Sequence, residues 1–283
     1  MLQLSLSLSR LLFLCCTLQC LVFVVGEKNA LNQEIYGFDA SWPTKTNKTI
    51  DVLGDKQSLY DAFMQTCRNA SGGLFAAYSC DHSEEFRLKM NNFQPMSMRN
   101  YTDMGFKKVR VPDKLFSILR SFWERNKDDA IQEWHSINTY HNMWESQPTL
   151  VNIQNYSIPG ATAEVQNQVW ELARSVLEEW TGQSLAPCSI WGIRIYHNNS
   201  ILAPHVDRNP LVASAIINVD QDVDEPWPLE VWAHDGKPYN ITMEPGDMVL
   251  YESHSVIHGE SREESPLFSP CTHPHTHPFS VCV

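Results

Sequence analysis

The sequence predicts an α+β protein in which helices back an antiparallel sheet of two layers, as in a jelly roll. Two segments with apolar residues at helical spacing, 111–126 and 161–181, come first. Six short segments with the pattern of β-strands follow them. Hydrophobic residues make up 43% of the chain, so a sizeable core is available to hold the layers together.

Both predicted helices have an apolar stripe and a recognisable end. The first is expected to begin at Pro112-Asp113. Its apolar residues are Leu115, Phe116, Ile118, Leu119, Phe122 and Trp123. The second carries Val165, Val169, Leu172, Val176 and Trp180, and Gly182 is a natural stop. A short helix is also expected near residues 60–64.

The six candidate strands are short and are separated by turn signals. They are residues 189–197, 201–206, 211–220, 229–233, 239–243 and 248–252. The turn signals include Asn209-Pro210 and Pro245-Gly246-Asp247. Residues 263–283 are rich in Ser, Pro and His and show no strand pattern, so we predict a divergent, disordered tail there.

The N-terminus predicts entry into the secretory pathway. Arg10 precedes an apolar run at residues 11–25, and Gly26 ends it. That length is short for a membrane span and suits a signal peptide over residues 1–26; a short membrane anchor with a lumenal domain is the alternative. We therefore expect a protein of the endoplasmic reticulum lumen or a secreted one.

The cysteines and the charge fit that expectation. Cys67 with Cys80, and Cys271 with Cys282, are local pairs that an oxidising lumen would permit. Six N-x-S/T sequons are compatible with a glycoprotein. The net charge of −12 argues against nucleic acid as a partner.

A candidate metal site follows one predicted strand. His205 and Asp207 are two residues apart, so an extended chain points both side chains the same way. A third ligand must come from elsewhere, and His258 and His254 both qualify because strand periodicity does not separate them. Two imidazoles and one carboxylate leave coordination positions open, which is typical of non-heme Fe(II) oxygenases.

These residues stand in segments that resemble prolyl 4-hydroxylases. Residues 195–207 read I-Y-H-N-N-S-I-L-A-P-H-V-D, with Tyr196 nine residues before His205 and Pro204 just before it. Residues 244–251, E-P-G-D-M-V-L-Y, resemble the family's K-P-x-x-G-d-a-l-x-F strand. Residues 255–259, S-V-I-H-G, resemble its S-L-H-x-G, which selects His258 over His254.

The resemblance implies a double-stranded β-helix over residues 110–262, preceded by a region of unknown role at 27–109. It implies Fe(II) at His205, Asp207 and His258, with Tyr196 contacting 2-oxoglutarate. The co-substrate would be decarboxylated to succinate while a C–H bond is hydroxylated, and ascorbate would restore oxidised iron. The expected substrate is a polypeptide, proline-rich and hydroxylated at proline.

The sequence departs from the family at the co-substrate anchor. The family has Lys or Arg ten residues after the distal His, but Phe268 stands there, and the closing strand of the fold is predicted to be missing. Arg262 is the nearby cation. Arg194, two residues before Tyr196, can also help to hold an anion, and an outward-facing position in solvent is as compatible with the sequence.

Three explanations stay open for this departure. Arg262 substitutes for the missing cation, or the chain binds metal without turnover, or the C-terminal stretch comes from an alternative or mispredicted exon. The alternatives to a peptidyl-proline hydroxylase are therefore a catalytically impaired metal-binding protein of the same fold and a 2-oxoglutarate oxygenase acting on a small molecule. A metal-dependent hydrolase ranks last, because no second carboxylate cluster is present. The oligomeric state is not encoded in any feature of the sequence.

Overall fold

The computed structural model describes residues 36–37, 57–69, 74–132, 147–197, 200, 202–224, 227–260 and 280–282. The chain divides into two compact units, Met1–Gly37 and Phe38–Val283. The first unit contributes one short strand, β1 (Tyr36–Gly37), and the predicted signal peptide lies outside the described residues. Among the described helices, none is long and apolar enough to cross a membrane.

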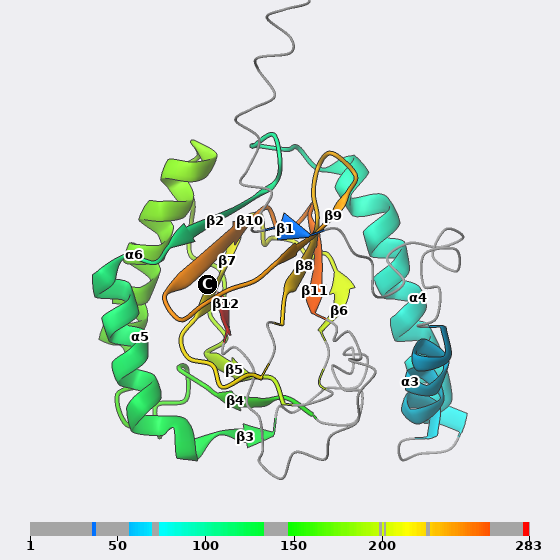
Figure 1. Cartoon of the computed structure of the whole chain (residues 1–283), viewed down its shortest axis with the longest axis horizontal. Coiled ribbons are helices and arrows are strands. Elements are labelled where there is room, and N and C mark those ends of the chain that lie inside the picture. Colours follow the sequence, from blue (N-terminus) through cyan, green and yellow to red (C-terminus); the bar gives the residue numbers. More distant parts are fainter. Residues whose placement is uncertain are drawn as a thin grey trace, which may run out of the picture. The chain divides into compact units, whose positions relative to one another are not determined.

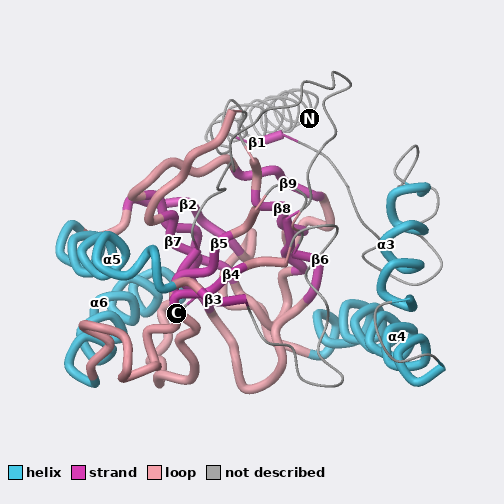
Figure 2. Tube along the Cα trace, turned by 90° about the horizontal axis from the view of Figure 1, so that it is seen from below, coloured by secondary structure: helices cyan, strands magenta, loops and turns pink. Residues whose placement is uncertain are grey.

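The helices in the described part of the second unit form two pairs. One pair is α3 (Gln57–Asn69) and α4 (Leu74–Ser97), and the other is α5 (Asp113–Asn126) and α6 (Ala163–Thr181). Both views show the strands between these pairs (Figures 1 and 2). A short 3-10 turn, η3 (Lys127–Asp129), follows α5.

The two predicted helices are confirmed, with ends that match their sequence signals. The hydroxyl of Thr162 accepts a bond from the Val165 amide at 3.2 Å and caps the start of α6. Gly182 follows its last turn in the left-handed conformation, with φ of 65°. The short helix expected near residues 60–64 is part of α3.

The strands that the structure describes form two antiparallel sheets. The larger has the order β2 (Phe106–Arg110), β10 (Asp247–Tyr251), β7 (Ser214–Asn218), β12 (Ser280–Cys282), β5 (Ile193–Ile195), β4 (Thr149–Val151) and β3 (Ile131–Gln132). In the other, β9 (Pro238–Ile241), β8 (Leu229–Trp232), β11 (Ile257–Glu260) and β6 (Leu202–His205) are neighbours in that order. Strands β5 to β12 thus distribute over both layers as in a double-stranded β-helix, which confirms the predicted α+β jelly roll.

The main hydrophobic core lies between the seven-stranded sheet and the α5–α6 pair. Buried residues of the helices include Leu115, Leu119, Val169 and Ala173, and those of the sheet include Ile193, Ile195, Ala215, Ile217, Met248 and Leu250. These strand residues alternate along each strand, so they occupy one face of the sheet. The opposite face is left for the interior of the jelly roll.

The closing strand that the sequence analysis predicted to be missing is present. Ser280 of β12 pairs with Arg194 of β5 on one side and with Asn218 of β7 on the other. The prediction was wrong because three residues after a Pro- and His-rich run are too few to show a period of two. The predicted disordered tail at 263–283 is corrected at residues 280–282, and residues 261–279 lie outside the described part.

No role was predicted from the sequence for residues 27–109. This region contributes α3, α4 and β2 to the same compact unit as the jelly roll. A disulfide joins Cys67 of α3 to Cys80 of α4, as the sequence allowed. Cys188 is a free, exposed thiol. The second expected pair, Cys271 with Cys282, lies outside the side chains that the structure describes.

Candidate metal centre

The structure brings together the three residues that the motifs selected. His205 ends β6 and is registered directly opposite His258 of β11, while Asp207 follows two residues after His205. Asp207 Oδ1 is 3.5 Å from His205 Nε2 and 3.9 Å from His258 Nε2. One ligand atom from each of the three residues lies within 4.8 Å of the other two, which is close enough for all three to bind a single ion.

The two imidazoles are oriented in the same way by their own strands. Nδ1 of His205 lies 2.9 Å from the Ala203 carbonyl oxygen, and Nδ1 of His258 lies 3.0 Å from that of Val256. A carbonyl only accepts, so each Nδ1 carries the proton and each Nε2 presents its lone pair. Both Nε2 atoms therefore point toward the Asp207 carboxylate, ready for one cation.

The charges favour a cation at neutral pH. Burial by itself raises the pKa of Asp207, but the His205 bond, the charges of His258 and His205 and the Ser253 hydroxyl outweigh it and lower this pKa to about 2. Burial, together with the charge of His205, lowers the pKa of His258 to about 4. The carboxylate is thus ionised and this imidazole neutral, the protonation states that metal ligands need.

The structure separates His254 from this cluster. The chain turns between β10 and β11, so the alternation that left His254 and His258 equivalent does not continue through both. His254 is buried, with Nδ1 2.5 Å from the Val212 carbonyl oxygen and Nε2 3.0 Å from that of Arg99. Both of its nitrogens are engaged in holding loops, so this residue is structural.

Tyr196 and Arg194 lie on the interior face of the larger sheet. Ile193 and Ile195 of β5 belong to the core under the helices, so the residues that alternate with them face the other way. Arg194 Nη1 is 3.4 Å from the Tyr196 hydroxyl oxygen. Tyr196 is buried, with its ring edge-to-face against Trp227 at 5.7 Å between centroids.

This interior face is also the face that is directed toward the three candidate metal ligands. Arg194 shares it with Asn218 across β12, because paired residues of neighbouring strands lie on one side of a sheet. Ser214 is four residues before Asn218 on the same strand, so both side chains lie on this face. The Ser214 hydroxyl donates to Asp207 Oδ2 at 3.3 Å. The alternative of an outward, solvated Arg194 is therefore wrong. Arg262 and Phe268 lie outside the described residues.

Polar residues on α4 hold the segment that bears His205 and Asp207, and they were not predicted from the sequence. Arg87, Asn91 and Gln94 make hydrogen bonds to the backbone of residues 204–207. Their spacing of four and three residues places them on one helix face. The spacing can be read in the sequence, but polar residues on one face of a helix usually face solvent. The pattern alone therefore does not indicate that these residues are buried.

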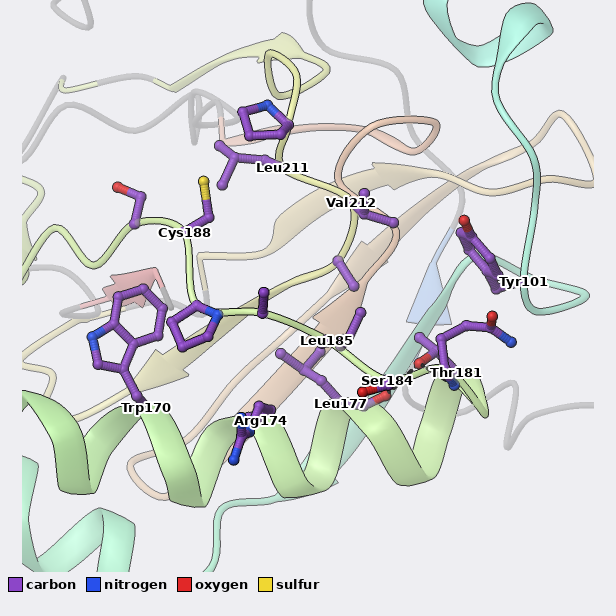
Figure 3. Close-up of a pocket in the computed structure, with 16 residues that line it drawn as sticks. Tyr101, Trp170, Arg174, Leu177, Thr181, Ser184, Leu185, Cys188, Leu211 and Val212 are labelled. Atoms are coloured by element: carbon purple, nitrogen blue, oxygen red, sulfur yellow. Dashed lines mark hydrogen bonds between the residues drawn. The ribbon is translucent and has the colours of Figure 1, made fainter.

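A separate pocket opens against α6 (Figure 3). Its volume is about 410 Å³, and Trp170, Arg174 and Leu177 of α6 line it together with Leu185 and Val212 from loops. Figure 3 shows the thiol of Cys188 and the side chain of Leu211 across the pocket from the helix. None of its lining residues is one of the three candidate metal ligands.

No known protein family matches the chain in a scan, and no curated protein matches its sequence. Similar solved structures include a prolyl-4-hydroxylase of Pseudomonas putida, with 13% identity, 63% of this chain and 90% of that chain covered, and a TM-score of 0.43. A prolyl hydroxylase of Trichoplax adhaerens, solved with a peptide fragment of hypoxia inducible factor, has 7% identity, 76% and 94% coverage and a TM-score of 0.42. The non-heme alpha ketoglutarate dependent epimerase SnoN from nogalamycin biosynthesis has 12% identity, 65% and 79% coverage and a TM-score of 0.42.

Proposed function

We propose that the chain is an Fe(II)- and 2-oxoglutarate-dependent dioxygenase that hydroxylates peptidyl-proline in the secretory pathway. The observation that carries the proposal is the arrangement of His205, Asp207 and His258. Two imidazoles, whose Nδ1 atoms face carbonyl oxygens and whose Nε2 atoms face the site, and one ionised carboxylate converge on one point. This donor set suits Fe(II) and leaves room for a bidentate co-substrate and O2.

Arg194 and Tyr196 are the proposed anchors of 2-oxoglutarate. A buried carboxylate needs a paired cation and hydrogen-bond donors, and a guanidinium beside a phenol hydroxyl supplies both. Both side chains lie on the face from which Ser214 reaches Asp207. Arg194 thereby stands in for the family's cation on the closing strand; Arg262, the sequence-based candidate, stays a prediction.

The chain's own residues orient the metal ligands and keep water out of the site. The iron and its co-substrate supply the oxidising chemistry when bound, and ascorbate restores oxidised iron. His205 and His258 hold their Nε2 atoms in place through their Nδ1 bonds. Ser214 keeps the second oxygen of Asp207 directed away from the two imidazoles. Tyr196 and Trp227 close the interior against water, since both side chains are buried.

Two further observations support the substrate and the compartment. The segments that resemble prolyl 4-hydroxylases contain all three ligands and Tyr196, and the resemblance is to enzymes that act on polypeptides. The disulfide between Cys67 and Cys80 is favoured in an oxidising lumen and fits the predicted signal peptide. A proline-rich peptide in the endoplasmic reticulum is therefore the first substrate to test.

The proposal is tested by ligand-dependent stabilisation followed by turnover. Mn(II), an inactive substitute for Fe(II), should raise the melting temperature, and 2-oxoglutarate should raise it further, by an amount equivalent to about 2.7 kcal/mol at a hundred times its Kd. Arg194→Met should keep the metal effect and lose the 2-oxoglutarate effect. Arg120→Met, which removes a cation that pairs with Asp220 and Glu124 instead, is the matched control.

Succinate release with Fe(II) and a proline-rich peptide completes the test. Peptide-dependent succinate and a hydroxylated peptide would support the proposal. Metal binding with no added effect of 2-oxoglutarate would identify a metal-binding protein without turnover. Stabilisation by 2-oxoglutarate without peptide-dependent succinate would instead favour a small-molecule substrate.

A further inference from the structure

One face of α4 is polar and buried. Glu84, Arg87, Asn91 and Gln94 follow one another at intervals of three, four and three residues, and each is at most 6% exposed. The opposite side of the helix is exposed and carries Phe86, Phe93 and Met96, all more than half exposed, together with the exposed Glu85–Lys89 pair. A helix that turns polar groups inward must satisfy them there, since a buried polar group without a partner is costly.

The partner of this face is strand β6, which ends in His205. β6 is the edge strand of its sheet, with β11 as its neighbour, and Figure 1 shows α4 beside it. An edge strand has a row of backbone groups that no neighbouring strand satisfies. Here the Pro204 carbonyl oxygen accepts from Arg87 Nη1 at 2.6 Å and from Asn91 Nδ2 at 2.9 Å. The Val206 amide donates to Asn91 Oδ1 at 3.0 Å.

Gln94 links the two segments that carry the metal ligands. Its Nε2 donates to the carbonyl oxygen of Asp207 at 2.6 Å and to that of His254 at 2.9 Å. The same two segments meet directly, because the Asp207 amide donates to the Ser253 carbonyl oxygen at 2.8 Å. One amide group therefore uses both of its hydrogens to fix the turn that bears Asp207 against the turn that leads to His258.

The α4 face is itself held rigidly. Glu84 accepts two bonds from the Arg87 guanidinium, and both side chains are buried. The Tyr60 hydroxyl of α3 donates to Glu84 at 2.7 Å, and the Cys67–Cys80 disulfide ties α3 to α4. The position of the Arg87 guanidinium is thus set by Glu84 independently of Pro204. Its bond to the Pro204 carbonyl oxygen therefore restrains the strand.

We infer that Gln94, supported by Asn91 and Arg87, is a positioning residue that sets the separation of Asp207 from His258 and thereby the affinity of the site for its metal. The inference rests on the metal site of the proposed function. Ligand separations must be kept within a few tenths of an ångström for tight binding, and a bridge between the two ligand-bearing turns controls that separation. Sequence patterns that place the ligands on strands do not reveal this control.

The test compares two variants that each lose one side-chain amide. Gln94→Met removes the two bonds from Gln94. Asn126→Leu is the matched control, because the buried Asn126 Nδ2 also donates to two backbone carbonyls, of Phe122 at 2.8 Å and of Pro159 at 3.0 Å, at the end of α5. Melting temperature measures the general loss in each, and a titration with Co(II), followed by visible absorption, measures the metal site.

We expect Gln94→Met to weaken Co(II) binding about tenfold or more and to alter the absorption bands, while Asn126→Leu lowers the melting temperature and leaves Co(II) affinity within about twofold. Equal Co(II) affinities in the two variants would overturn the inference. If Gln94→Met does not fold, Gln94→Asn, which is one methylene too short to bridge both carbonyls, takes its place with the same expectations.

A metal-free measurement separates this inference from the proposed function. In the metal-free chain, amide hydrogen exchange of the peptide over residues 204–208 should be faster in Gln94→Met than in Asn126→Leu. Failure of the wild-type chain to bind Co(II) would refute the metal site and the affinity claim with it. Exchange that is unchanged by Gln94→Met would refute the bridge even if the wild-type chain binds Co(II).

Discussion

Gly259 provides a sharp test of the geometry that brings β11 against β6. A Cβ added at this position would lie 2.5 Å from the Leu202 carbonyl oxygen and 2.8 Å from two backbone atoms of Pro204. The obstacles are backbone atoms, so no side-chain rotation relieves them. In Gly259→Ala the contact with Leu202 must lengthen from 2.5 Å to about 3.4 Å, which moves β11 away from β6.

The neighbouring His258 has to move with its strand, away from His205 and Asp207. A metal site tolerates about 0.2 Å in its ligand distances, so a displacement several times larger should weaken Co(II) binding on the order of a hundredfold. The same overpacking should lower the free energy of unfolding by about 1–3 kcal/mol.

Gly182→Ala separates this effect from a general loss of stability. Gly182 has φ of 65° and no atom within 4 Å of an added Cβ, so alanine there is strained without touching the metal site. It should cost about 1 kcal/mol and leave Co(II) affinity unchanged. Co(II) titration and urea unfolding of both variants provide the measurement. Wild-type Co(II) affinity in Gly259→Ala would refute the close approach of β11 and β6.

Two further predictions concern stability. Burial alone would raise the pKa of Asp247, but the bond from Lys108 at 2.8 Å and further bonds from the Glu244 amide and Arg110 outweigh it and lower this pKa. The stabilisation is therefore fully present above the ordinary carboxyl pKa and is lost as pH falls through the lowered one. Asp247→Asn should cost about 1–3 kcal/mol at pH 7, because its cationic partners keep part of their solvent, and the gap to the wild-type chain in urea unfolding should shrink as pH falls below the ordinary carboxyl pKa; a gap independent of pH would contradict the ion pair. Removal of the disulfide in a Cys67→Ser and Cys80→Ser double variant should cost about 2–3 kcal/mol in the same assay, and an unchanged unfolding midpoint would show that α3 needs no tether to α4.

The helices α5 and α6 and most strands of the jelly roll could be predicted because their apolar residues meet the core at regular intervals. Val169 and Leu119 illustrate this, since each is fully buried where its stripe places it. The three candidate ligands were selected by motif spacing, and the fold brings them together. Strand periodicity alone left His254 and His258 equivalent, because it does not reveal the turn between β10 and β11.

Helix α4 escaped prediction because polar residues lie on its buried face and aromatic residues on its exposed face. Asn91 is fully buried while Phe93 is 65% exposed, so a hydrophobic pattern carries no information about the face that packs. The orientation of Arg194 was undecidable for a related reason. An arginine at the middle of a three-residue strand belongs to either face until the neighbouring strands fix which side holds the core.

The position of β12 has a consequence for biosynthesis. β5 and β7 do not pair with each other, because β12 lies between them. While the polypeptide is still being made, the group β2–β10–β7 and the group β5–β4–β3 therefore have no common ladder until residues 280–282 emerge from the ribosome. Both unpaired edges stay open to other nascent chains during that interval, so the yield of folded protein should depend on chaperones that shield such edges.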